Sequence, residues 1–432
     1  MSEEIKNVQE ELNDQMQIRR DKLAEYEADG IYPFGQRFVV KDHAKDIKND
    51  FLNYEDQPTV IAGRLMTMRS HGKTAFANIR DLTGDIQVYF RKDVLGEDNY
   101  KYVKMLDIGD IVGIEGHVFR THSGEVTIKV NKLTLLSKAL RPLPEKWHGL
   151  KDTELRYRQR YVDLIVNPEV RDTFIKRSKI VAKIREYMMN DGFMEVETPM
   201  MHPIPGGAAA RPFITHHNAL DIDIYMRIAP ELYLKRLIVG GMERVFEMNR
   251  CFRNEGIDNR HNPEFTTIES YQAYGDVEDA IRLTENLVSY CAQEVLGTQE
   301  ITYQGTEINL TPPWNRITMA EGVKKYTGED FDAVTTVEEA RAIADRLNVE
   351  YTDNDGIGKI LNACFEDYVE ENLIQPTIVY GHPKEISPLA KASRENPLAT
   401  ERFEAFIYGR ELANGFSELN DPIDQKQRFL DQ

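Results

Sequence analysis

The sequence contains few of the residues that build disulfide frameworks, thiolate metal sites or membrane spans. Only three cysteines occur among its 432 residues, Cys251, Cys291 and Cys364, and no two lie close together. This spacing argues against a disulfide framework and against a cysteine-bound zinc ion. The longest apolar runs fall far below the roughly 20 residues that cross a bilayer, and the opening MSEEIKNVQEEL lacks a basic-then-apolar signal. We therefore expect a cytoplasmic protein with no membrane partner.

Basic residues are scarce relative to acidic residues, and the imbalance is uneven. The chain has 54 Lys and Arg against 72 Asp and Glu, a net charge of −18. Residues 1–150 carry 22 basic and 24 acidic residues, which leaves 32 and 48 for the remainder. The acidic excess argues against loose, sequence-blind binding to DNA. A local basic groove stays compatible with it, because salt confines surface fields to about 10 Å.

The length predicts two or three folded units, since one domain usually takes roughly 150 residues. We expect an N-terminal helix and lead-in over 1–58, a barrel over 59–140, a linker over 141–170 and a larger domain over 171–432. The linker begins with RPLPEKWHGL, whose two prolines and glycine break regular structure.

Residues 59–137 consist of short β-rich runs separated by turn signals. Five strands in about 80 residues are typical of a closed barrel of the oligonucleotide-binding (OB) type, which offers one face to single-stranded nucleic acid. On that face, Phe76 is a candidate to stack on an unpaired base and Gln87 to read a base edge. The alternative for Phe76 is a place in the core, where strand aromatics more often lie.

Beyond residue 171, strands follow strands while helices are set aside. This order predicts an α+β domain with an antiparallel sheet rather than a doubly wound parallel one. Its most informative run is RVFEMNRCFRNEGIDNRHNPEFTTIESYQAY at 244–274, which indicates a strand, a loop and a returning strand.

Charged side chains concentrate on this strand pair. Arg253 and Glu255 end the first strand two residues apart, while Glu264 or Phe265, then Glu269 and Tyr271, alternate along the second. Buried charges are costly unless they hold a charged group. Two interpretations stay open: a ligand site, or a structural ion pair of Arg253 with Glu255 or Glu269.

The same run resembles the second signature motif of class II aminoacyl-tRNA synthetases, in which an arginine–glutamate pair and an Arg-His-x-Pro-Glu-Phe loop build the ATP site. FIKRSKIVAKIREYMMNDGFMEVETP at 174–199 resembles their first motif, a helix, strand and proline at the interface of a homodimer. Within the class, residues 205–237 and 409–422 are most similar to the bacterial lysyl-tRNA synthetase family. The resemblance implies ATP-dependent activation of L-lysine and its transfer to tRNA(Lys).

The resemblance also implies a role for individual residues around lysine. Glu231 matches the ligand of the α-ammonium group, and Tyr271 with Glu418 matches the pair that holds the ε-ammonium group. Asn414 and Arg253 match the residues at the substrate carboxylate, and Gly207 and Glu269 complete the lysine site. Carboxylates in these places favour a cationic amino acid and argue against an aspartyl- or asparaginyl-type ligase on the same scaffold.

For ATP, the resemblance places Arg253 at the α-phosphate as the catalytic cation and Phe265 against the adenine ring. Glu255 and His261 match loop residues that contact the nucleotide. Glu404 and Glu411 match the magnesium ligands, with Mg²⁺ as the cofactor. The seven-residue spacing of that pair also fits a solvated helix face. An unbroken strand would place the two on opposite faces, so we expect a bend at Gly409.

The family's third motif, a glycine-rich strand and helix ending in an arginine, does not appear before Gln432. Gly356-Ile357-Gly358-Lys359 comes too early and lacks the flanking pattern. This departure predicts an incomplete ATP site. It leaves a second hypothesis, a catalytically impaired synthetase-like protein that binds tRNA or regulates.

Overall fold

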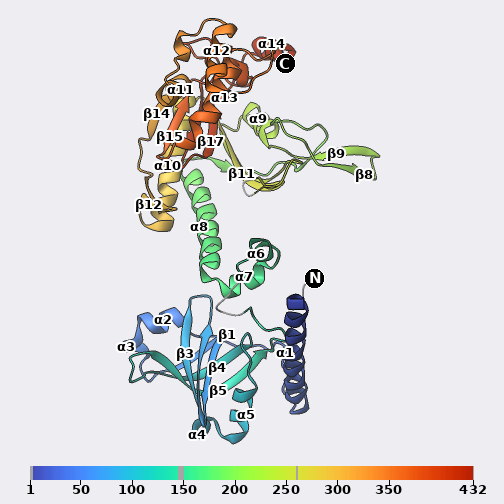
Figure 1. The fold of residues 1–432 in the computed structure, drawn as a ribbon, viewed down its shortest axis with the longest axis vertical. Coiled ribbons are helices and arrows are strands. Elements are labelled where there is room, and N and C mark those ends of the chain that lie inside the picture. The colour runs from blue at the N-terminus through green and yellow to red at the C-terminus, as the bar shows by residue number, and fades with distance from the viewer. Residues whose placement is uncertain (1–2, 145–149, 259–260, 432) are drawn as a thin grey trace. The chain divides into compact units, whose positions relative to one another are not determined.

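The computed structural model describes residues 3–144, 150–258 and 261–431 (Figure 1). The chain divides into two compact units, Met1–Asp172 and Thr173–Gln432. The finer division of the first unit at residues 58 and 140 stays a prediction, and part of the expected linker, 145–149, lies outside the described residues. In the described part of the chain, no helix is both long and apolar enough to span a membrane.

The first unit contains a closed barrel of five strands, in the order β1-β2-β3-β5-β4. Residues along β2 and β3 alternate strictly between buried and half-buried, so that Ile79 and Val88 point into the core. This confirms the predicted five-stranded OB-type barrel. Its elements are β1 (Pro58–His71), β2 (Thr74–Arg80), β3 (Asp85–Arg91), α4 (Lys92–Leu95), α5 (Glu97–Met105), β4 (Ile111–Arg120) and β5 (Val126–Ser137).

Helix α1 (Glu3–Ala28) is tied to one end of the barrel by basic side chains. The buried Arg19 guanidinium donates to the carbonyl oxygens of Ala139 at 2.8 Å and of Ile108 at 3.1 Å. Lys22 Nζ lies 2.7 Å from Asp107 Oδ1. Arg19 and Lys22 therefore already have oxygen partners within the first unit. The remaining helices of this part are α2 (Ala44–Asn49), α3 (Phe51–Tyr54), α6 (Thr153–Arg158), α7 (Arg160–Val166) and α8 (Pro168–Asn190), which continues into the second unit.

The second unit is an α+β domain whose described strands form several small sheets. Most pairs are antiparallel, as predicted, but β10 pairs with β6 and β14 pairs with β15 in parallel. The strands are β6 (Met194–Glu195), β7 (Met201–His202), β8 (Ile214–His217), β9 (Ile222–Met226), β10 (Arg244–Phe252), β11 (Glu264–Gln272), β12 (Glu300–Tyr303), β13 (Thr306–Asn309), β14 (Asn315–Thr318), β15 (Thr377–Tyr380), β16 (Arg402–Phe406) and β17 (Glu411–Phe416).

Helices cover both faces of the four-stranded sheet β14-β15-β16-β17. On one face, α10 packs Ile281 against Ile378, Phe403 and Ala405. On the other, α11 and α13 contribute to a core that includes Val379 and Phe406 (Figure 1). The helices of this unit are α9 (Glu231–Val239), α10 (Val277–Leu296), α11 (Met319–Thr327), α12 (Val337–Leu347), α13 (Ile357–Tyr368) and α14 (Pro422–Asp431), with short 3₁₀ turns at Phe331–Ala333, Glu370–Asn372 and Lys384–Ile386.

The ammonium group of Lys138 is fully buried at the end of the barrel. Replacing this residue tests whether its ion pairs stabilise the first unit. The ammonium group lies 2.8 Å from Asp110 Oδ2 and also contacts Asp107. We expect Lys138→Met to lower the free energy of unfolding of the first unit by about 3–5 kcal/mol, since it leaves the buried Asp110 without its cation and Asp107 with Lys22 alone.

Lys132→Met is the matched control for that variant. Lys132 forms an exposed pair with Glu115 in the same barrel, at 2.7 Å. It should change the stability by less than about 1 kcal/mol. Denaturant unfolding followed by circular dichroism measures both. Equal losses for the two variants would contradict the structural role of Lys138.

Candidate active site

The antiparallel pair β10–β11 confirms the predicted strand, loop and returning strand. Cys251 pairs with Phe265 and Glu247 with Glu269. Phe265, Glu269 and Tyr271 therefore share one face of β11, and Glu264 lies on the other. This resolves the alternative left open between Glu264 and Phe265. Strand β10 ends at Phe252, so the expectation that Arg253 and Glu255 end the strand itself is wrong: both lie in the loop that follows.

Arg253 is held by its backbone while its side chain keeps free hydrogen-bonding capacity. Its amide donates to the carbonyl of Pro263 at 2.8 Å, and its guanidinium carbon lies 5.1 Å from the centre of the Phe265 ring. Its Nε is buried without a hydrogen-bond partner. In the described part of the chain, Arg253 forms no ion pair with Glu255 or Glu269. A guanidinium left unpaired beside an aromatic ring suits an incoming phosphate or carboxylate.

Three acidic residues of the predicted lysine site come together around α9, which packs against β10 and β11. Glu231 opens α9, and Gly207 adopts φ +91° against it, so that a Cβ on Gly207 would lie 3.1 Å from the Glu231 Cβ. Glu231 in turn helps to raise the pKa of Glu269 and of Glu418. The site therefore gathers carboxylates from α9, β11 and the segment after β17.

Lys235 is a member of this site that the sequence analysis missed. Its Nζ lies 2.7 Å from Glu231 Oε1 and 2.9 Å from Glu418 Oε2. Burial acts to lower the pKa of Lys235, but the two carboxylates raise it above its usual value. One resident ammonium group thus already bridges the carboxylates predicted for the two ends of lysine. The sequence signal that could have identified Lys235 is its position one helical turn after Glu231, from which its side chain reaches the same carboxylate.

Glu269 and Tyr271 lie in a strongly desolvated part of the site. Burial, then the charge of Glu231, raises the pKa of Glu269 to about 7. The Tyr271 hydroxyl donates to Glu269 Oε2 at 3.3 Å, and burial with the neighbouring carboxylates raises the pKa of Tyr271 well above its usual value. An added ammonium group would relieve the repulsion among these carboxylates.

A buried ion pair beside Glu269 was also missed by the sequence analysis. Arg227 Nη1 lies 2.6 Å from Glu247 Oε1, and both side chains are almost completely buried. The Thr198 hydroxyl donates to the second Glu247 oxygen at 2.6 Å. Arg227 also offsets part of the rise in the pKa of Glu269, so this ion pair supplies positive charge next to that carboxylate.

The β16–β17 hairpin brings Glu404, Glu411 and Asn414 to one face. Glu404 pairs directly with Asn414, whereas Phe406 pairs with Glu411 across a register shift that leaves Leu412 as a bulge. Gly409 lies in the connecting turn with φ +64°. The expected bend at Gly409 is therefore confirmed, and the bulge supplies the remaining change of face. A solvated helix is excluded for this pair.

The two carboxylates of this hairpin lie in different electrostatic surroundings. Burial and the Glu404 charge raise the pKa of Glu411, while Arg253 acts in the opposite direction. Burial also acts to raise the pKa of Glu404, but His382 and Arg402 hold it below its usual value. Arg253 acts on both Glu269 and Glu411, so the hairpin and the β11 face belong to one site.

Glu404 and Glu411 fit a hard divalent cation as oxygen donors. Burial and then the Glu404 charge raise the pKa of Glu411, and a bound cation would offset both effects. Among described residues, no group of three or more Asp, Glu, His or Cys is arranged to hold a metal. A cation held by this pair would therefore complete its coordination with oxygens from water or a phosphate. Mg²⁺ prefers such a mixed shell.

Glu255 and His261 are not brought into the buried part of the site. Both are exposed on the loop between β10 and β11, of which residues 259–260 lie outside the described part. Glu255 accepts a hydrogen bond from the Arg211 amide at 3.3 Å, and His261 Nδ1 lies 2.7 Å from Asp258 Oδ2. Their predicted contacts with the nucleotide stay a prediction.

The outer face of the barrel carries the predicted nucleic-acid residues. Phe76 stacks on Tyr89 with ring centres 4.3 Å apart, and Tyr89 lies 6.2 Å from Phe119. Phe76 is therefore a surface residue and not part of the buried core. Gln87 accepts from the Thr127 hydroxyl at 2.8 Å, which leaves its amide hydrogens available to a base edge.

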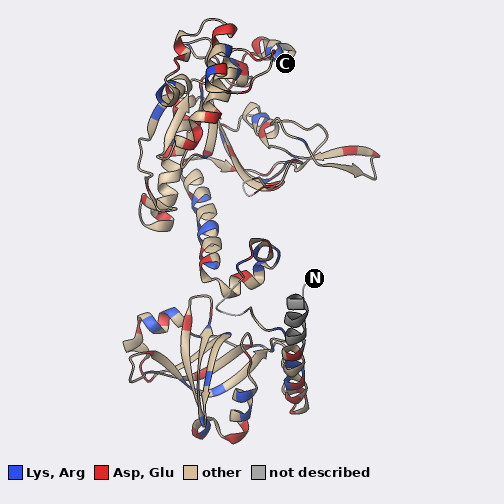
Figure 2. Ribbon diagram, viewed as in Figure 1, with Lys and Arg blue, Asp and Glu red and all other residues tan. Residues whose placement is uncertain are grey.

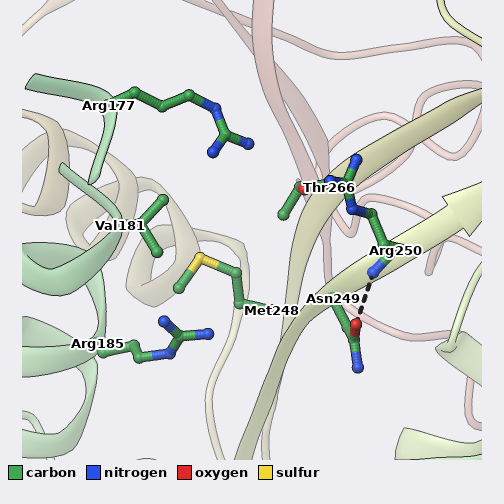
Figure 3. Close-up of a pocket in the computed structure, with 7 residues that line it drawn as sticks. All are labelled: Arg177, Val181, Arg185, Met248, Asn249, Arg250 and Thr266. Atoms are coloured by element: carbon green, nitrogen blue, oxygen red, sulfur yellow. Dashed lines mark hydrogen bonds between the residues drawn. The ribbon is translucent and has the colours of Figure 1, made fainter. Parts of the chain in front are cut away.

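A cavity of about 210 Å³ lies apart from all these groups, between α8 and the β10–β11 pair (Figure 3). Figure 3 shows Arg177, Val181 and Arg185 projecting from α8 toward Met248 and Thr266. None of the predicted lysine or ATP residues lines it. Basic side chains recur along α8 (Figure 2), and Phe174, Ile175, Ile180 and Met189 are exposed on the same helix.

The raised pKa of Glu269 predicts a dependence of stability on pH. Its folded pKa of about 7 exceeds the ordinary value of 4.5, so the unfolded state loses its proton first as pH rises. Because of this group, the free energy of unfolding falls as the pH rises from about 4.5 to 7, and it stays at the lower value above pH 7. Glu269→Gln should raise the free energy of unfolding at pH 8 by about 1–3 kcal/mol, and by much less at pH 5.5.

Glu264→Gln is the matched control for that variant, because Glu264 lies on the same strand with an exposed side chain. It should show no comparable difference between pH 5.5 and pH 8. Thermal unfolding at the two pH values checks both. A gain for Glu269→Gln that is equal at both pH values would contradict the assigned ionisation.

Comparison with known proteins agrees with this geometry. Residues 152–432 match the family described as tRNA synthetases class II (D, K and N), and residues 59–136 match the OB-fold nucleic acid binding domain. The lysine–tRNA ligase of Thermoanaerobacter pseudethanolicus is 58% identical over 432 residues, covering 100% of this chain and 87% of that protein.

Two further relatives carry the same name. The lysine–tRNA ligase of Carboxydothermus hydrogenoformans is 58% identical, covering 98% of this chain and 87% of that protein. That of Bacillus subtilis is 56% identical, covering 99% of this chain and 87% of that protein. The chain therefore belongs to the lysine–tRNA ligase family of class II tRNA synthetases.

Proposed function

We propose that the protein activates L-lysine with ATP and transfers the lysyl group to tRNA(Lys). One observation carries the choice of substrate: the buried Glu231 on α9 and the partly buried Glu269 on β11 and Glu418 after β17 converge near Arg253, which has no ion-pair partner among the described residues. A ligand with two ammonium groups and one carboxylate matches that charge pattern. The relatives give no support to the catalytically impaired alternative.

In the proposed complex, Glu231 and Gly207 hold the α-ammonium group, while Tyr271 and Glu418 hold the ε-ammonium group. Glu269 adds negative charge beneath them. Arg253 and Asn414 take the carboxylate. Because Lys235 bridges Glu231 and Glu418, lysine binding redistributes existing ion pairs. An apolar side chain would leave these carboxylates without a second cation, which disfavours neutral analogues.

ATP is proposed to bind beside Arg253, with its adenine ring on Phe265 and its loop contacts from Glu255 and His261. Glu404 and Glu411 would hold Mg²⁺, which neutralises phosphate charge when bound. Arg253 is suited to the α-phosphate because its backbone is fixed by Pro263 and its guanidinium by the Phe265 face. Its proposed catalytic role is to stabilise negative charge that grows there in the transition state.

The proposed chemistry has two steps and uses no protein nucleophile. A lysine carboxylate oxygen forms a bond to the α-phosphorus, and the bond from that phosphorus to pyrophosphate breaks. A terminal ribose hydroxyl of tRNA then bonds to the lysyl carbonyl carbon, and AMP leaves with the electron pair. The chain's residues position the reactants. Burial raises the pKa of the thiols of Cys251, Cys291 and Cys364 to about 11, which suits none of them for nucleophilic catalysis.

The barrel is proposed to bind the tRNA anticodon through its outer face. Phe76, stacked with Tyr89, offers an aromatic platform for an unpaired base, worth about 1–3 kcal/mol per base. Gln87 lies on the adjacent strand with its amide hydrogens free to donate. We place this activity in the cytoplasm, where translation occurs.

A homodimer is proposed through α8 and the short strand β6. Phe174, Ile175 and Ile180 on α8 and Met194 on β6 are large apolar residues that stay exposed in the single chain. Such residues are costly to leave in water, and a symmetric partner would bury them. The cavity between α8 and β10 opens beside these residues and belongs to the same surface.

Lysine-dependent exchange between ATP and pyrophosphate tests the proposed activation step. Exchange should require lysine and fail with norleucine or aspartate. Glu418→Gln should raise the KM for lysine about 100-fold, because a neutral amide cannot pair with the ε-ammonium group. Glu338→Gln, on the exposed face of α12, is the control and should leave the KM unchanged. Exchange that proceeds equally with norleucine would refute the proposal.

A further inference from the structure

All three nitrogens of the Arg402 guanidinium form hydrogen bonds, and these link Asn414, proposed to bind the lysine carboxylate, with Glu404, proposed to bind the metal. Arg402 opens β16, and its side chain is only 17% exposed. Nε donates to Asn414 Oδ1 at 3.0 Å, and one Nη group contacts Glu404 Oε1. The other Nη donates to the carbonyl of Ile386 at 3.2 Å and to the Ser387 hydroxyl at 3.0 Å. The planar group is thereby fixed from three segments of the chain.

The contact with Asn414 decides which end of its amide is available. Arginine has donors and no acceptor, so only the carbonyl oxygen of Asn414 can face it. The amide nitrogen must then point away, and the Asn414 side chain is exposed at that point of the hairpin. An amide nitrogen donates hydrogen bonds and is suited to a carboxylate. A reversed amide would present an oxygen and repel that carboxylate.

The contact with Glu404 acts on the neighbouring half of the site. Glu404 is directly opposite Asn414 in the β16–β17 register. His382 Nε2 lies 3.4 Å from the second oxygen of Glu404 but forms no hydrogen bond, so the contact with Arg402 is the one that orients this carboxylate. Arg402 thus orients a proposed ligand of the metal and a proposed ligand of the amino acid with one rigid group.

We propose that Arg402 is a positioning residue that presents the Asn414 amide to the lysine carboxylate and holds Glu404 for the divalent cation. The inference rests on the proposed function and adds a residue to it. Arg402 itself touches neither substrate. Its loss should therefore affect only those ligands whose recognition needs the Asn414 amide or Glu404.

Calorimetric titration without ATP or metal separates this role from general support of the fold. Cadaverine is the probe, since it has two ammonium groups and no carboxylate. In Arg402→Met, the Kd for lysine should rise about 10-fold or more, while the Kd for cadaverine changes less than about 2-fold. Equal weakening of both ligands, or of neither, would overturn the proposal. Arg346→Met, which breaks an exposed pair with Glu329, is the matched control and should change neither Kd.

Two further variants keep the test decisive if Arg402→Met does not fold. Arg402→Lys keeps the charge but lacks the planar set of donors, and should weaken lysine binding selectively as well. Asn414→Asp keeps a partner for Arg402 but removes the donor. It should weaken lysine binding by at least as much as Arg402→Met, again sparing cadaverine. Lysine binding that survives in Asn414→Asp would overturn the proposal.

The wild-type protein distinguishes failure of this inference from failure of the proposed function. If wild type binds lysine no better than norleucine, the lysine site itself is wrong, whatever the Arg402 variants show. If wild type prefers lysine but Arg402→Met retains the full difference between lysine and cadaverine, only the role of Arg402 is wrong. A higher Mg²⁺ concentration for half-maximal exchange in Arg402→Met would further support the contact with Glu404.

Discussion

The catalytic unit depends on one electrostatic constraint: carboxylates are gathered in a desolvated space and must be balanced there. Burial raises the pKa of Glu269 to about 7 and that of Glu418 and Glu411 above the usual value. Cationic side chains of the protein itself offset part of the free-energy cost of holding these carboxylates together. Lys235 bridges two of the carboxylates. The compensation is partial, and the charge that remains is the basis that we propose for binding a diamino acid and a metal-bound nucleotide.

Resident cations and free cations have different roles in this arrangement. Arg402 donates to protein oxygens through all three of its guanidinium nitrogens and fixes the geometry of Glu404. Arg227 forms an ion pair with Glu247, although its Nη2 is buried without a hydrogen-bond partner. Arg253 is instead held by its backbone and an aromatic face, with a buried Nε left without a partner. Arg227 and Arg402 are thus used in ion pairs with protein carboxylates, whereas Arg253 forms no ion pair among the described residues and is the arginine that we propose takes part in the reaction. The β16–β17 bulge then sets Glu404, Glu411 and Asn414 on one face, next to Arg253.

Much of this could be predicted from the sequence because the signals were local. Short β-rich runs separated by turn residues predicted the five-stranded barrel, and the run from Arg244 to Tyr274 predicted the β10–β11 pair. The seven-residue spacing of Glu404 and Glu411 required a bend, which the turn at Gly409 provides. The family resemblance supplied residue roles that no spacing rule contains.

The parts that escaped prediction depend on contacts between distant segments. Lys235 meets Glu418 across 183 positions of the sequence, and Arg402 reaches Ser387 in a loop with no regular pattern. The bulge at Leu412 could not be predicted from the alternation of side chains along a strand, because a bulge interrupts that alternation. Phe76 on the outer barrel face, rather than in the core, followed from the register of β2 and β3, which sequence periodicity alone leaves open by one residue.

The central claim is that balanced carboxylates select a substrate by its second ammonium group. Isothermal titration of the wild-type chain with lysine and with norleucine, which differ chiefly in that group, tests it most directly. The account predicts that lysine binds at least about 100-fold more tightly than norleucine, with the difference shrinking as pH falls below 7 and Glu269 takes up a proton. Equal affinities for the two amino acids at pH 8 would contradict it.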